Sequence, residues 1–344
     1  MGGNVVKLVR QLSKALVLLL SVYAFTSATT MAGEPAGTVP AAKKRASDQL
    51  SLMLFRLKMF YYEARSSTVA TLDLPLFKAY FSLPESKRNF YNIMGSLHLS
   101  DEQHRVRQNL EEWVLMLHKR FPIGETCLID REGQEHLRVV GGNVEKPVHF
   151  SSEEQGSPFF KLSFATRTGE VHVSEPYMSA DSFRWVVAFT SPIEMDDGSR
   201  PAFFHFEVPL SIHQELINTQ DFGFNRNRNL IYDDDEEGRY FILDRSSGLL
   251  IADSRQSIDY ELKAERHPHK TPDLSDFLPP EKLRDYLPSL SSISDAPEFL
   301  TAARLMQDGG EGVLDLDIEG QSYILAFMPI AGRDWSIAHL DPVN

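Results

Sequence analysis

The stretch Leu128-Ile129-Asp130-Arg131-Glu132-Gly133 recurs later in the chain as Ile242-Leu243-Asp244-Arg245-Ser246-Ser247-Gly248. Each copy is a short apolar run that ends in aspartate and enters a turn containing glycine, a pattern typical of a strand leading into a hairpin. A second pair repeats in the same order, as Val187-Ala188-Phe189-Thr190-Ser191-Pro192-Ile193 and then Leu325-Ala326-Phe327-Met328-Pro329-Ile330. Two pairs in matched order indicate that one α+β unit occurs twice in this chain.

Apolar runs and turn-forming residues around the repeats predict the strands and helices of each unit. In the first unit we expect strands at 127–130, 135–140, 170–174, 185–190 and 202–208, a short helix at 159–166 and a helical stretch at 209–218. In the second unit we expect a hairpin from 240–244 and 248–252, a helix at 298–306 and strands at 312–318, 321–328 and 335–340. Each unit is therefore predicted to be an antiparallel sheet with helices between its second and third strands.

A long helical region precedes the first unit. Its first helix is predicted to begin near Ser47 or Asp48, which are good N-caps. Its apolar residues have the spacing of an amphipathic helix: Leu50, Met53, Leu54, Leu57, Phe60, Tyr61 and Ala64. Further helices are expected at 75–81, 85–97 and 100–120, the last with Ser100 as N-cap and Gln103 completing a capping box. Residues 33–45 contain Pro and Gly and are predicted to form a linker. The chain then divides into a linker and helical region (33–120), a first unit (121–218) and a second unit (219–344).

Residues 1–32 have the pattern of an export signal. Basic residues precede the apolar run 15–25, and small residues follow that run up to Ala32. This order is typical of a secretory signal peptide, and the apolar run is shorter than the roughly 18 residues of a membrane span. We therefore expect a periplasmic or secreted protein after cleavage; the alternative is an uncleaved N-terminal anchor in the inner membrane that faces the periplasm.

The composition excludes several classes of protein. Lys and Arg number 35 against 48 Asp and Glu, a formal net charge of −13, whereas binding of a phosphate backbone requires clustered positive charge. We therefore expect no nucleic-acid partner. The single cysteine, Cys127, excludes an intramolecular disulfide and a Cys-rich zinc site. We expect its thiol to behave as a small buried apolar group.

No short catalytic or metal-binding motif carries a function here. The chain contains no nucleophile-elbow, zinc-protease, phosphate-loop or dinucleotide-binding signature. His267-Pro268-His269 and the acidic run Asp233–Glu237 are best interpreted as solvated segments, because neither has the further ligands of a zinc or EF-hand calcium site. We therefore expect a protein that is not an enzyme and that carries no cofactor or metal.

One stretch of the first unit carries a resemblance to a known family. The segment Gly169-Glu170-Val171-His172-Val173-Ser174-Glu175-Pro176-Tyr177, continuing to Trp185 and Ser191-Pro192-Ile193, resembles the double Cache sensor module, and Asp334-Trp335-Ser336-Ile337 resembles its closing strand. The resemblance covers about residues 46–341. It implies an α+β fold in which a long N-terminal helix precedes two PAS-like antiparallel-sheet units.

The resemblance also implies a function. Double Cache modules usually bind a small molecule in the first, membrane-distal unit and signal to a kinase, cyclase or chemoreceptor segment. In this sequence the last predicted strand is followed directly by Asn344. We therefore expect a sensor module that signals through a separate membrane partner.

The resemblance allows the site to be predicted residue by residue. The amino-acid-binding branch reads the ligand carboxylate with an Arg-x-Trp-Tyr run, but Ser157-Pro158-Phe159-Phe160 stands there in this chain. Tyr177 matches the branch, Ser179 replaces the aspartate partner of that tyrosine, and Glu207 corresponds to the later aspartate. Because serine cannot replace a bidentate arginine, we expect no ordinary α-amino-acid binding.

We predict instead an aromatic-walled pocket for an apolar or cationic ligand. Its predicted ligand-binding residues are Phe159, Phe160, Ser174, Tyr177, Trp185 and Glu207. Arg138 is interpreted as a member of a surface ion pair rather than of the pocket.

Two alternatives stay open at this point. The first is a structural or interaction protein whose pockets are filled by its own side chains, with the stripe at 50–64 serving as a homodimer or partner face. The second is a hydrolase whose catalytic carboxylates are dispersed along the chain.

Overall fold

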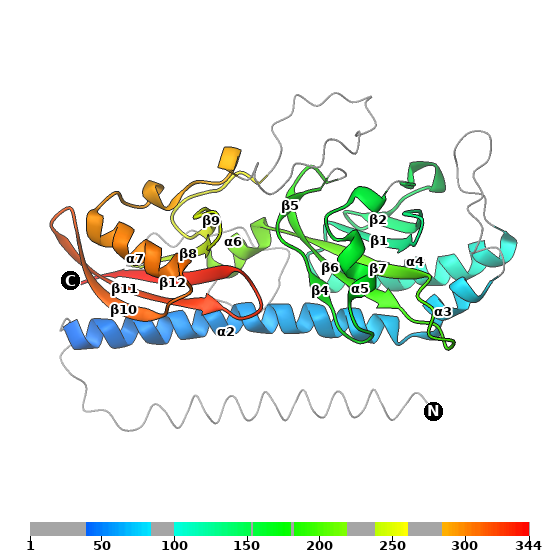
Figure 1. The fold of residues 1–344 in the computed structure, drawn as a ribbon, viewed down its shortest axis with the longest axis horizontal. Helices are drawn as coiled ribbons and strands as arrows, with labels where there is room; N and C mark the ends of the chain where they lie inside the picture. The colour runs from blue at the N-terminus through cyan, green and yellow to red at the C-terminus, as the bar shows by residue number, and fades with distance from the viewer. Residues whose placement is uncertain are drawn as a thin grey trace, which may run out of the picture.

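The computed structural model describes residues 39–83, 100–152, 154–179, 182–218, 238–260 and 284–343. One long helix, α2 (Val39–Leu72), runs alongside two sheets that lie end to end along it (Figure 1). Among the described residues, no helix is both long enough and apolar enough to cross a membrane. Several predictions fall outside these residues: the export signal, the helix at 85–97, the acidic run Asp233–Glu237 and His267-Pro268-His269, together with the Gln103 side chain.

Helix α2 begins earlier than predicted. Residues 39–45 are helical, so the prediction that they form part of a linker is wrong. Pro40 is tolerated because it lies in the first helical turn, where its missing N–H would have no helical partner. Lys43 pairs with Asp315, and Arg45 pairs at 2.9 Å with Asp341 of the second unit. The basic residues therefore fasten the start of the helix to the second sheet.

The predicted apolar stripe of α2 is buried within the chain itself. Leu50, Leu57 and Ala64 are 0% exposed, and α2 packs against strands of both sheets. A sheet buries one face against another element, and α2 supplies that cover for both units. The prediction that this stripe itself is a homodimer or partner face is therefore wrong, because the chain's own strands occupy it.

The first unit contains a seven-stranded antiparallel sheet. Its strand order is β3-β2-β1-β7-β6-β4, and β5 also pairs with β6. The strands are β1 (Glu125–Asp130), β2 (Glu135–Val140), β3 (Asn143–Val144), β4 (His172–Val173), β5 (Tyr177–Met178), β6 (Trp185–Ile193) and β7 (Ala202–Pro209). The strand predicted at 170–174 is shorter than expected, because the Ser174 side-chain oxygen, instead of a backbone carbonyl, accepts the N–H of Ala188 at 2.9 Å.

The second unit contains a five-stranded antiparallel sheet of order β10-β11-β12-β8-β9. Its strands are β8 (Arg239–Asp244), β9 (Leu250–Asp253), β10 (Gly312–Ile318), β11 (Gln321–Ile330) and β12 (Trp335–Pro342). In both units the last strand lies between the first strand and the penultimate one: β7 between β1 and β6, and β12 between β8 and β11. The predicted repeat of one α+β unit behind a long helix is thus confirmed.

The remaining helices cover the sheets. They are α3 (Pro75–Ser82), α4 (Asp101–Arg120), α5 (Phe160–Ala165), α6 (Ser211–Asn218) and α7 (Pro297–Gln307), with short 3-10 turns at Pro147–His149, Glu154–Gly156 and Leu290–Ser292. Helix α7 packs on the second sheet, α6 lies at the junction of the units, and α5 lies on the first sheet.

The first sheet separates two groups of buried side chains. Trp185 and Phe189 point toward α2, where the Phe189 ring stacks on Tyr61 with 5.8 Å between ring centres. Because side chains alternate along a strand, Val186 and Ala188 of β6 point to the opposite face and join Cys127, Ile129, Phe159, Phe160, Tyr177 and Phe203. This second face, away from α2, carries the candidate site.

Candidate functional site

Two adjacent strands bring polar side chains together on the face away from α2. Cys127 of β1 pairs in register with His205 of β7, and Glu125 pairs with Glu207. Directly opposed residues in an antiparallel pair lie close together on one face of the sheet. The strands thus place a thiol, an imidazole and two carboxyl groups side by side in the interior.

A β-bulge adds a third carboxyl group. The register of β1 with β2 shifts between Leu128 and Ile129, so Arg138 pairs with Cys127 while Glu135 pairs with Ile129. Glu135 and Arg138 are three residues apart and would face opposite sides of a regular strand. The bulge turns both toward the same face, which is a common use of bulges beside functional sites.

Four carboxyl groups and one guanidinium are buried around this point in the described part of the chain. Glu125, Glu135, Glu154 and Glu207 are 2, 1, 6 and 3% exposed, and Arg138 is 9% exposed. Arg138 Nε lies 3.0 Å from Glu125 Oε1, and its Nη1 lies 3.7 Å from Glu135 Oε2. The interpretation of Arg138 as part of a surface ion pair is therefore wrong, since it is the buried counter-charge of the cluster.

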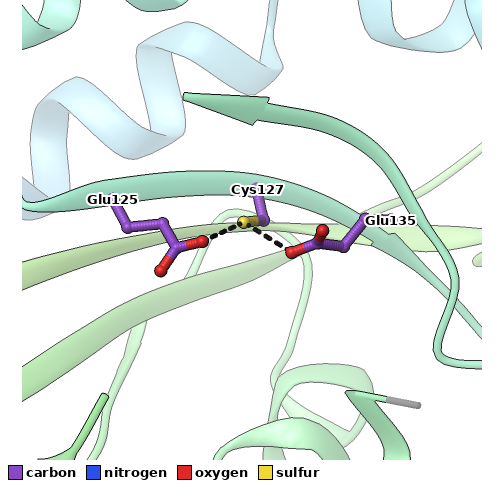
Figure 2. Close-up of side chains that lie close together, drawn as sticks. All are labelled: Glu125, Cys127 and Glu135. Carbon is purple, nitrogen blue, oxygen red and sulfur yellow. Dashed lines mark hydrogen bonds between the residues drawn. The ribbon is translucent and has the colours of Figure 1, made fainter. Parts of the chain in front are cut away.

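Cys127 lies between two of these carboxyl groups (Figure 2). Its Sγ is 3.2 Å from Glu125 Oε1 and 3.0 Å from Glu135 Oε1. A thiol carries one hydrogen, so it can donate to only one of the two oxygens at a time. Burial, together with the negative charge of Glu125 and Glu135, raises the pKa of the Cys127 thiol well above its ordinary value. The thiol is therefore protonated at neutral pH.

Tyr177, His205 and Phe159 form the other side of the cluster. The Tyr177 hydroxyl donates to Glu207 Oε1 at 2.7 Å and lies 3.3 Å from His205 Nε2. The Phe159 ring stacks on the His205 ring with 4.3 Å between ring centres. Burial lowers the pKa of His205 to about 3, so the imidazole is neutral, and burial beside Glu207 raises the pKa of Tyr177 well above its ordinary value.

A small cavity lies among these residues. Its volume for a water-sized occupant is about 10 Å³, and it is lined by Glu125, Cys127, Ile129, Glu135, Glu154, Phe159, Ser179, His205 and Glu207. A cavity needs roughly 10–15 Å³ by this measure to hold one water. The site as folded thus admits a single water-sized occupant with polar atoms around it.

The structure brings together some of the predicted ligand-binding residues and separates others. Phe159, Tyr177 and Glu207 meet at the cavity. Phe160 is on the same face but packs against Phe164 and Phe203 outside the cavity lining.

Two predicted residues lie elsewhere. Ser174 accepts the N–H of Ala188 and donates to the backbone oxygen of Glu175, so its hydroxyl fastens the chain beside β6. Trp185 points to the α2 face and meets Tyr286 of the second unit, with 5.7 Å between ring centres. Trp185 therefore forms no wall with Tyr177.

Sequence reasoning missed the carboxyl groups of Glu125, Glu135 and Glu154 and the imidazole of His205. One signal was available for Glu125: it stands two residues before Cys127, so in a strand the two side chains share a face. Charged residues inside a strand that is buried along its whole length are costly unless paired, and they are therefore informative.

A larger cleft of about 390 Å³ lies beside the end of α2, lined by residues that include Leu72, Lys78, Pro192 and Asp196. Three of its charged groups, Lys78, Glu194 and Asp196, are already paired. Lys78 binds Asp196 at 2.7 Å, and Glu194 accepts from Arg200 at 3.1 Å. The cleft lacks the buried, convergent polar groups that mark the cavity on the other face.

Comparison with known proteins identifies the fold. No family model matches the chain, and no curated protein matches its sequence. The sensory domain of the Campylobacter jejuni chemoreceptor Tlp3 with isoleucine bound is 13% identical, with a TM-score of 0.55 over 88% of this chain and 93% of that chain. The extracellular domain of vpHK1S-Z8, described as a histidine kinase, is 12% identical, with a TM-score of 0.55 over 88% of this chain and 92% of that chain.

A domain of a sensory box/GGDEF family protein from Vibrio parahaemolyticus is likewise 12% identical, with a TM-score of 0.53 over 88% of this chain and 96% of that chain. These likenesses extend over nearly the full length of each neighbour. The chain therefore has the fold of a Cache-type sensory domain, as the sequence resemblance implied.

Proposed function

We propose that this chain is an extracytoplasmic sensory module that binds a small ligand in its first unit and signals through a separate membrane partner. The observation that carries the proposal is the buried polar cluster on the outer face of the first sheet. The same fold is used by sensory domains of chemoreceptors and histidine kinases. A cavity lined by several convergent ionisable groups is the usual mark of a binding site.

The charges of the cluster favour a positively charged ligand. Four carboxyl groups line the cavity, and Arg138 lies within ion-pair distance of two of them. Ser157 stands where the amino-acid-binding branch places its arginine, and its hydroxyl donates to Glu154 Oε2 at 2.6 Å. A carboxylate thus occupies the neighbourhood in which that branch would hold the ligand's own carboxylate. Like charges repel strongly in a buried site, so an α-carboxylate ligand is disfavoured.

The geometry supports binding rather than catalysis. The dispersed-carboxylate hydrolase would need a cleft that admits a substrate between two carboxyl groups. Here the carboxyl groups of Glu125 and Glu135 are separated by the Cys127 thiol, and the space beside them holds about one water. The neighbours of like fold are sensory domains. We therefore infer a protein that is not an enzyme.

Association through the N-terminal helix stays a prediction, with different residues from those first expected. The stripe at 50–64 is buried in the chain. On the outer side of α2, Leu52, Phe55 and Tyr62 are exposed. These three side chains are the ones available for a homodimer or a membrane partner.

Thermal-shift screening tests the proposal. The purified chain is heated with metabolites, amines, organic acids and purines, and a ligand at about 100 times its Kd stabilises the fold by roughly 2.7 kcal/mol. We expect hits among cations, and we expect Glu207→Gln and Tyr177→Phe to abolish the shift. Glu112→Gln is the matched control, because Glu112 is exposed on α4 of the same unit.

Two results would contradict the proposal. One is that no compound in the library stabilises the chain. The other is that a hit shifts the Glu207→Gln variant as much as the unaltered chain, which would place its binding site elsewhere.

A further inference from the structure

Three potential metal ligands converge at the cavity. One ligand atom from each of Glu125, Cys127 and Glu135 lies within 4.8 Å of the others, and all three residues are buried (Figure 2). Exposed acidic groups often lie together without binding an ion, but buried ones carry a desolvation cost that a bound cation offsets. The position of these three groups inside the sheet therefore needs an electrostatic explanation.

The size of the cavity selects the kind of cation. Its volume of about 10 Å³ for a water-sized occupant is close to that of one water, and a single metal ion is of comparable size. Four carboxyl groups line the space, and Arg138 pairs with two of them. The charge excess therefore points to a small ion of high positive charge.

A fourth donor supplies independent support. His205 lines the same cavity, is 2% exposed and has no hydrogen-bond partner for Nδ1 among the described residues. A buried polar nitrogen without a partner costs free energy. His205 is also the register partner of Cys127, so its ring lies next to the thiol. A water bound to an ion in the cavity would give this nitrogen a partner.

We propose that this cavity binds one divalent transition-metal ion of the zinc class, through Cys127, Glu125 and Glu135, with a water as the fourth ligand. Thiolate together with carboxylate favours zinc and its neighbours over magnesium or calcium, which prefer oxygen ligands alone. Three protein ligands with a fourth open position is a common zinc arrangement. The site does not depend on the proposed sensory role, since an ion can bind there whether or not the module signals.

Binding would change the site in two definite ways. The Cys127 proton must leave, because the metal ligand is the thiolate; one proton is released to solvent for each ion bound. In a tetrahedral zinc site, the Zn–S and Zn–O bond lengths place a sulfur ligand about 3.6 Å from an oxygen ligand. The Cys127 sulfur now lies 3.2 Å from the Glu125 oxygen and 3.0 Å from the Glu135 oxygen. Each carboxylate oxygen would therefore lie about half an ångström farther from the Cys127 sulfur when the ion is bound.

Cobalt(II) absorption tests the proposal directly. The full chain is stripped with a chelator and titrated with Co²⁺, whose thiolate-to-metal charge-transfer band can come only from Cys127, since the chain has 1 cysteine. We expect this band to saturate at one ion per chain and to be absent in Cys127→Ser. Glu135→Gln should weaken Co²⁺ binding at least about tenfold, whereas Glu112→Gln should bind as the unaltered chain does.

Thermal melting with Zn²⁺ provides a second measurement. Zn²⁺ should raise the melting temperature of the unaltered chain and not that of Cys127→Ser, whose circular dichroism shows whether it is folded. Absence of Co²⁺ binding, or Co²⁺ bound without the charge-transfer band, would overturn the metal site. An organic cation that stabilises the chain in the metabolite screen, alongside a failed Co²⁺ titration, would leave the sensory proposal standing and remove this one.

Discussion

Two buried histidines should lower the free energy of unfolding as the pH falls from 7 to 5. This interval lies above the pH range in which carboxylates ordinarily titrate. His205 and His213 are 2 and 0% exposed, and burial lowers the pKa of each to about 3. His213 accepts from or donates to the Tyr61 hydroxyl at 2.7 Å and lies 3.2 Å from the backbone oxygen of Leu210. With Nδ1–H donating to that carbonyl, Nε2 is left to accept from Tyr61, so the neutral ring satisfies both neighbours.

The size and sign of the effect follow from proton linkage. A histidine in the unfolded chain has a pKa of about 6.5, so below that value the unfolded state binds a proton that the native state does not. The free energy of unfolding therefore falls as the pH is lowered from about 7 toward 3. For a native pKa of about 3, lowering the pH from 7 to 5 costs about 1.9 kcal/mol per histidine.

Urea unfolding at pH 7 and pH 5 measures this loss. We compare the unaltered chain with His205→Gln and His213→Gln, in which the titrating ring is replaced by a neutral side chain. Each variant starts with a different stability, but its loss between the two pH values should be about 1.9 kcal/mol smaller than that of the unaltered chain. Other titrating groups are common to all the proteins and cancel in the comparison.

The exposed His104 of α4 provides the matched control. His104→Gln should lose as much stability between pH 7 and pH 5 as the unaltered chain. If His205→Gln and His213→Gln also lose as much as the unaltered chain, then the native rings are protonated or solvated at pH 5, and the argument from burial is refuted.

Three further changes probe the site and its surroundings. Arg138→Met should lower the free energy of unfolding by about 3–5 kcal/mol, because it leaves buried carboxyl groups without their counter-charge; an unchanged urea midpoint would show that the carboxyl groups are neutral. Phe159→Ala removes the ring that stacks on His205 and should cost about 3–5 kcal/mol, so a loss below about 1 kcal/mol in the same assay would mean that the ring is loosely held. Arg333→Ala removes a charged donor 2.7 Å from the backbone oxygen of Ser174, and it should lower the free energy of unfolding by about 1.5–3 kcal/mol. A melting temperature equal to that of the unaltered chain would show that this bond contributes nothing to stability.

The fold was accessible from sequence because its signals are local. Strand and turn patterns lie within single stretches of chain, and the two copies of each stretch support one another. The start of α2 was missed because the residues that support it are distant in the sequence. Residues 33–45 combine Pro and Gly with a basic run, and only the distant Asp315 and Asp341 of the second unit give that run a helical role.

The site was less accessible because it depends on register. The sequence shows that alternate residues of a strand share a face of the sheet. It does not show which residues of two different strands share that face, because this depends on how the strands pair. Tyr177 and Trp185 lie on neighbouring strands and point to opposite faces, a difference that only their pairing determines. The bulge that turns Glu135 toward Cys127 leaves no mark that would separate Glu135 from an exposed glutamate.

The contact of Arg333 with the first unit bears on how the two units could communicate. Arg333 precedes β12 of the second unit, stacks over Trp335 at 4.3 Å and donates to the backbone oxygens of Val173 and Ser174. Ser174 is three residues before Tyr177, whose hydroxyl bonds Glu207 at the cavity. Residues 174–177 therefore connect the proposed ligand site to a contact with the second unit. Arg333 is buried, and its bond to Ser174 is charge-assisted, so the segment that carries Tyr177 of the cavity is also fastened to the second unit.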